Sequence, residues 1–137
     1  MKHDIRWIQR FSNFKKAVEK LCDALHNLEG LSDLEKEGVI QRFEYTFELA
    51  WKTLQDLLAH KGYLDIKGPS PVLKQALLDG YILGENSWRK MKEARELTSH
   101  TYDESRANEI VLKINEEYCE LLLQLKTRLD QELAKEL

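Results

Sequence analysis

The stretch that decides the fold is SDLEKEGVIQRFEYTFELAWKTLQDLLAHKG, residues 32–62. It opens with Ser32 and Glu35 at the spacing of a capping box, in which the two side chains satisfy backbone N–H groups at a helix start. Apolar residues then recur every three or four positions, as they do on one face of a helix. Gly62 suits the left-handed conformation in which many helices end. We therefore expect one long amphipathic helix that ends at Gly62.

A second long helix is predicted directly before this stretch, over residues 4–26. Its apolar positions also step by three or four and are Ile8, Phe11, Phe14, Val18, Leu21, Leu25 and Leu28. Residues 27–31, with Gly30 among them, are typical of a short turn. Two long helices with so short a connection should pack as an antiparallel hairpin.

A loop and a short helix follow residue 62. Ser70 as a cap and Pro71 in the first helical position predict a helix over residues 72–78 that ends at Gly80.

Two further helices complete the chain. One begins near residue 85 or 86 and carries an apolar stripe of Trp88, Met91 and Leu97. The last is capped by Asp103 or Ser105. Its apolar positions are Ala107, Ile110, Val111, Ile114, Tyr118, Leu121, Leu122, Leu125, Leu129 and Leu133.

The predicted fold class is all-α, a single domain over residues 1–137 that forms an antiparallel up-down four-helix bundle with an additional short helix. The first, second and last helices carry more apolar positions than one inner seam would absorb. We expect a homodimer to cover the surplus.

Composition limits the function. The net charge of −3 argues against general affinity for nucleic acid. A local patch of Arg89, Lys90, Lys92 and Arg95 could still contact RNA, or it could be a solvated helix face. Cys22 and Cys119 lack the spacing of a zinc site or a disulfide framework, and no cofactor or metal site is indicated. No signal peptide or membrane span is recognisable, so we expect a cytoplasmic protein.

The candidate chemistry lies in residues 88–104, WRKMKEARELTSHTYDE. Arg95 offers a planar fork of donors suited to phosphate, and His100 can exchange a proton near neutral pH. Helical steps of about 100° place Tyr102 near the face of Arg95 but His100 roughly 140° away. Convergence of the three requires the helix to loosen near Ser99, or a second copy of the chain.

The Arg95-Glu96-Leu97-Thr98-Ser99-His100 pattern resembles the signature of the HEPN superfamily of small helical proteins. The longer string LTSHTYDE, residues 97–104, is similar to the nucleotidyltransferase substrate-binding subunits, which are HEPN partners of separate minimal nucleotidyltransferases. The resemblance covers essentially the whole chain. It implies a nucleotide- or substrate-binding subunit of a two-component system of toxin–antitoxin type. The chain has no Asp-x-Asp pair or Gly-Ser-rich loop, so it is not expected to be a nucleotidyltransferase itself.

Two alternatives stay open. In one, the chain is a metal-independent ribonuclease in which His100 moves the proton and Arg95 stabilises the charged phosphorane. In the other, it is a structural helical dimer in which Arg95 pairs with Asp103 or Glu104 and His100 caps a helix end. The nuclease branch commonly has Asn where this chain has Glu96, whose carboxylate would repel a phosphate unless it points away.

The remaining candidate residues belong to a nucleotide or RNA contact. Lys92 and Ser99 are predicted to contribute to it with Arg95 and His100. Trp88 could stack on a base or lie in the core. The resemblance implies that Tyr102 is the residue to which a partner enzyme attaches a nucleotide; alternatively, Tyr102 packs on the bundle with its hydroxyl at the rim. Elsewhere, His60 is expected to interact with helix-end carbonyls.

Overall fold

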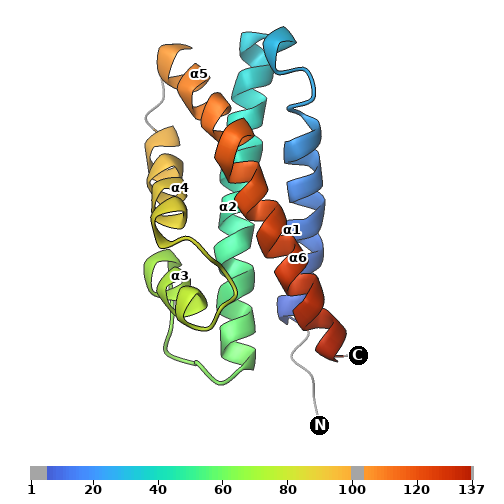
Figure 1. Cartoon of the computed structure of the whole chain (residues 1–137), viewed down its shortest axis with the longest axis vertical. Helices are drawn as coiled ribbons and strands as arrows, with labels where there is room; N and C mark the ends of the chain where they lie inside the picture. The colour runs from blue at the N-terminus through green and yellow to red at the C-terminus, as the bar shows by residue number, and fades with distance from the viewer. Residues whose placement is uncertain (1–5, 100–103, 137) are drawn as a thin grey trace.

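The computed structural model describes residues 6–99 and 104–136, and within them it contains helices and turns but no strand (Figure 1). The predicted all-α bundle is confirmed. Its elements are α1 (Arg6–Asp23), α2 (Asp33–His60), α3 (Pro69–Leu78), α4 (Glu85–Thr98), α5 (Glu104–Lys113) and α6 (Cys119–Glu136). A π-helical turn, η2 (Ile114–Tyr118), joins α5 to α6, so together they form the fourth long element. The additional short helix is α3.

The α1–α2 hairpin is the base of the bundle. The two helices lie side by side (Figure 1), joined through a short 3₁₀ turn, η1 (Leu28–Gly30). The capping box is present, because the Ser32 Oγ accepts the Glu35 N–H at 3.1 Å and the Glu35 carboxylate accepts the Ser32 N–H at 3.0 Å. Gly62 follows the end of α2 with a φ of +110°, as expected of a helix terminator.

One predicted helix start is wrong, and one of the two caps suggested for the last helix is excluded. Helix α3 begins at Pro69, with Gly68 as its N-cap, so Ser70 lies inside the helix. A proline suits the first helical position because the N–H that it lacks would have no helical partner there. The Gly68 N–H is satisfied by the Gln55 side chain at 2.8 Å. Ser105 lies within α5 and does not cap it, and the alternative, Asp103, is outside the described residues.

The core absorbs the apolar surplus within one chain. The apolar positions predicted on the first and last helices are all buried or packed against the core. The same holds for those predicted on α2, which are Val39, Ile40, Phe43, Phe47, Ala50, Trp51, Leu54, Leu57 and Leu58. Phe43 stacks on Tyr118 with ring centroids 5.5 Å apart, which ties α2 to η2. Leu97 is instead 55% exposed, so its predicted place in the α4 apolar stripe is wrong. In the described part of the chain, no helix is long and apolar enough to cross a bilayer.

Candidate functional site

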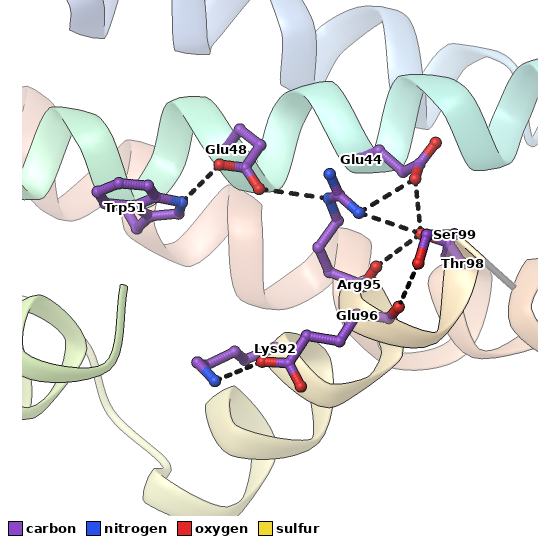
Figure 2. A network of polar contacts seen from close by, with 8 residues as sticks. All are labelled: Glu44, Glu48, Trp51, Lys92, Arg95, Glu96, Thr98 and Ser99. Atoms are coloured by element: carbon purple, nitrogen blue, oxygen red, sulfur yellow. Dashed lines mark hydrogen bonds and ion pairs between the residues drawn. The ribbon is translucent and has the colours of Figure 1, made fainter. Parts of the chain in front are cut away.

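The described part of the signature lies on the last turns of α4, which packs against α2 (Figure 2). Trp88 and Met91 are 2% and 0% exposed and fix α4 in the core. The predictions on His100 and Tyr102 fall outside the described residues, so the convergence of Arg95, His100 and Tyr102 stays a prediction. The burial of Trp88 favours the core alternative, because its ring has no open face on which a base could stack.

Arg95 points from α4 toward α2 and lies between two carboxylates (Figure 2). Its Nη1 donates to Glu44 Oε2 at 3.1 Å, and its Nε lies 3.4 Å from Glu48 Oε1. The Arg95 side chain is 26% exposed. The sequence suggested Asp103 or Glu104 as the partner of Arg95. Asp103 lies outside the described residues, and the carboxylates that contact Arg95 belong to α2 and not to Glu104. Arg95 therefore links two helices.

Thr98 completes this junction. Its hydroxyl is 2.7 Å from both Glu44 Oε2 and the Arg95 carbonyl, so it donates to one or the other. It also accepts from Arg95 Nη1 at 3.4 Å. Thr98 is only 8% exposed, and a buried hydroxyl without a partner would be costly. The last turn of α4 is thus fastened to α2 by side-chain hydrogen bonds.

Glu48 is held from its other side as well. Trp51 Nε1 donates to Glu48 Oε2 at 2.8 Å (Figure 2). Glu44, Glu48 and Arg95 together carry a formal charge of −1, which does not attract a phosphate. As described, Arg95 is a structural counterion, and it would have to leave these carboxylates before it could bind a phosphate group.

The other predicted contacts on α4 are also engaged. Lys92 pairs with Glu96, whose side chain is 60% exposed and points away from Arg95 (Figure 2). The Glu96 carboxylate therefore does not lie beside Arg95, which is the orientation that would avoid repelling a phosphate there. Ser99 is exposed and donates to the Glu96 carbonyl at 2.9 Å. Arg89 donates to Asn86 Oδ1 at 2.9 Å. These contacts are typical of a solvated helix face.

Glu44 and Glu48 were not predicted as site residues. Their spacing of four places both on one face of α2, beside an otherwise apolar stripe, and this was the available signal. The prediction for His60 is also wrong. Its Nε2 lies 2.9 Å from the Glu136 carboxylate at the end of α6, because the two helix ends meet there.

A helical bundle with a polar signature at the end of α4 defines a class of small all-α subunits, and comparison with known proteins identifies the family. The model of the family "Nucleotidyltransferase substrate binding protein like" matches residues 9–131. The chain belongs to this family.

The chain is also similar to three known proteins. "Probable ribonuclease HepT" of Haemophilus influenzae is 32% identical over 98 residues, which are 66% of this chain and 67% of that protein. A crystal structure from Thermus thermophilus is 38% identical, with a TM-score of 0.74, and the match covers 85% of this chain and 98% of that one. A second Haemophilus influenzae structure is described as the fold of a substrate binding domain of a nucleotidyltransferase. It has a TM-score of 0.78 at 22% identity over 88% of this chain and 98% of that one, which shows the shared fold.

Proposed function

We propose that this chain is a substrate-binding subunit of HEPN type that works with a separate minimal nucleotidyltransferase. Its family supports this role, as does its fold, which it shares with a substrate binding domain of a nucleotidyltransferase. The sequence lacks the Asp-x-Asp pair that metal-dependent nucleotidyl transfer requires, so the transfer step belongs to another chain.

The attachment of Arg95 to Glu44 and Glu48 is the observation that carries the proposal. Because the guanidinium is neutralised, α4 offers an anchored helix end rather than a phosphate clamp. In this proposal the partner enzyme acts at the anchored end of α4. In this proposal Tyr102 is the acceptor. Its phenolic oxygen bonds to the α-phosphorus of ATP, pyrophosphate leaves, and the phenolic proton passes to solvent.

Intact-protein mass spectrometry tests this role. The chain is incubated with its partner nucleotidyltransferase, ATP and Mg²⁺, and the expected result is the added mass of a nucleotidyl group. Tyr102→Phe should abolish the addition, whereas Tyr63→Phe, at an exposed tyrosine after α2, should not. An unmodified wild-type chain, or equal addition to the Tyr102→Phe variant, would contradict the proposal.

A second candidate function is metal-independent ribonuclease activity, favoured by the 32% identity to "Probable ribonuclease HepT". In this mechanism His100 acts as a general acid or base, and Arg95 must exchange its α2 carboxylates for the phosphate. Wild-type protein should then cleave RNA in EDTA. His100→Ala should slow cleavage by about 10²- to 10⁴-fold, the usual worth of general acid–base catalysis. RNA that stays intact with wild-type protein would exclude this candidate.

We also propose a homodimer that brings two signatures together. Leu97 on α4 and Leu112 on α5 are 55% and 46% exposed, and in this proposal both side chains take part in the dimer contact. Light scattering should give twice the chain mass at micromolar concentration, and Leu97→Glu with Leu112→Glu should give monomer. A monomeric wild-type chain would contradict this. A dimer inactive in both assays above would leave a purely structural role.

A further inference from the structure

A pocket of about 350 Å³ lies between α1 and α2, away from the α4 signature in sequence and in its lining. Three cationic side chains line it: Lys16 and Lys20 from α1 and Arg42 from α2. Tyr45, which is 59% exposed, adds an aromatic ring. The lining contains no carboxylate, although the chain as a whole has a net charge of −3.

The charge of these cations is not neutralised by acidic partners. Across the described residues, none of the three forms an ion pair with a carboxylate, in contrast to Arg95. Arg42 Nη1 instead donates to the Lys20 backbone carbonyl at 3.0 Å. This bond positions the guanidinium across the helix boundary and leaves its full charge in the pocket. Three like charges that converge on one pocket repel one another, so an anion bound among them would be stabilised.

A second pocket of about 270 Å³ also has Arg42 in its lining. Its other lining residues combine Ala24, Leu31, Gly38 and Val39 with the charged Glu35. The carboxylate of Glu35 accepts the Ser32 N–H of the capping box. We call the two pockets together the α1–α2 groove; its first part is cationic, and its second part combines apolar residues with Glu35.

Gly38 provides a separate indication of a ligand. Glycine inside a helix costs stability relative to alanine, so it usually has a local reason. A Cβ added at Gly38 would meet no heavy atom within 4 Å, so packing within the chain does not require glycine here. The missing side chain leaves the backbone of α2 open in the second pocket, where a flat ring could approach it closely.

We propose that this α1–α2 groove binds a nucleotide, with its phosphate among Lys16, Lys20 and Arg42 and its base in the second pocket beside Gly38. Tyr45 at the rim would stack on a neighbouring base if the nucleotide belongs to a strand. The shared chemistry is a phosphate next to a base, supplied either by a free nucleotide or by single-stranded RNA. This inference is independent of the proposed function, because the groove contains no residue of the α4 signature.

Fluorescence anisotropy with two probes tests the site: a fluorescent ATP analogue and a labelled single-stranded RNA of ten nucleotides. Lys16→Glu with Lys20→Glu should weaken binding by about tenfold or more, since two phosphate contacts become repulsive. The control, Lys67→Glu with Lys74→Glu, changes the net charge equally at exposed positions outside the groove and should change affinity by less than about twofold. Binding of the ATP analogue identifies a free nucleotide, and binding of RNA alone identifies a strand.

Gly38→Ala separates binding from folding. Alanine should raise Tm because it favours the helix, yet it should weaken binding because its methyl group fills the floor of the groove. A purely structural glycine would change Tm alone. If neither probe binds at millimolar concentration, the groove is not a nucleotide site. If the groove and control variants lose affinity equally, its cations do not hold the phosphate. If Gly38→Ala leaves the affinity unchanged, the base does not bind beside Gly38.

Discussion

Substitution of Glu132 on α6 tests how the end of α2 is held against α6. The Glu132 side chain is 4% exposed, yet it carries a carboxylate. Lys61 Nζ lies 2.7 Å from Oε1, while Arg128 Nη1 and Lys135 Nζ lie 3.2 Å and 3.5 Å from Oε2. Arg128 also donates from Nε to the Gly80 carbonyl at 3.3 Å, which connects the cluster to the turn after α3.

The pKa of Glu132 gives the magnitude of the effect. Burial alone would raise it, but hydrogen bonds from Lys61 and Arg128 and the charges of Lys61 and Lys135 outweigh burial and lower the pKa from 4.5 to about 2. Each pH unit of such a shift is worth about 1.4 kcal/mol, so ionised Glu132 stabilises the folded chain by about 3 kcal/mol at pH 7. Because the pKa is lower in the folded state, this stability is complete above about pH 5 and is lost as the pH falls toward 2.

Glu132→Gln keeps the shape and removes the charge. We expect the free energy of unfolding at pH 7, measured by urea denaturation, to fall by about 3 kcal/mol and Tm to fall by about 10 °C. Glu120→Gln, at an exposed position of the same helix, should change it by less than about 0.5 kcal/mol. The difference between wild type and Glu132→Gln should shrink between pH 5 and pH 3. A difference that is the same at both pH values, or no larger than that of Glu120→Gln, would refute the reasoning.

Three further predictions concern local contacts. Ser32→Ala removes the capping box and should lower the free energy of unfolding by about 1 kcal/mol in urea denaturation; an unchanged midpoint would show that the cap is dispensable. Thr98→Val deletes the hydroxyl that bonds Glu44 and should cost about 1–3 kcal/mol, with hydrogen exchange rising at the end of α4; uniform exchange would contradict a local role. A hydrogen bond from Cys119 lowers the pKa of Cys22, whereas the same bond and burial raise the pKa of Cys119. Iodoacetamide at pH 8 should therefore modify Cys22 first in a mass-spectrometric time course, and the reverse order would count against this assignment.

The fold was largely predictable because its determinants are local. The capping box at Ser32 and the three-to-four spacing of apolar residues specify helices without reference to distant contacts. The errors also have local causes. Pro69 and Pro71 both suit a first helical position; the prediction placed Pro71 there, whereas α3 begins at Pro69. The π-helical turn at Ile114–Tyr118 was missed because apolar spacing over five residues does not separate π from α geometry.

The site was less predictable because its contacts join distant parts of the chain. Arg95 was identified by its chemistry, and the divergence of neighbouring helix residues allowed Glu96 to point away, as it does. The partners of Arg95 are Glu44, 51 residues earlier in the chain, and Glu48 on the same helix. A single sequence does not state which helix faces pack together. The hydrogen bond between the free thiols of Cys22 on α1 and Cys119 on α6 was not predicted either, because it also depends on which helix faces pack together.

The position of Arg95 bears on how its mutants should be interpreted. Different nitrogens, Nη1 and Nε, contact Glu44 and Glu48, so the fold itself uses the planar fork that also suits a phosphate. A lysine would keep the charge but could not span both carboxylates in this way. Removal of Arg95 would leave two partly buried carboxylates close together without a counterion, which is destabilising in itself. Loss of function in Arg95→Ala therefore supports a role in phosphate binding only if α4 stays docked on α2, as judged by the exchange of its amide hydrogens.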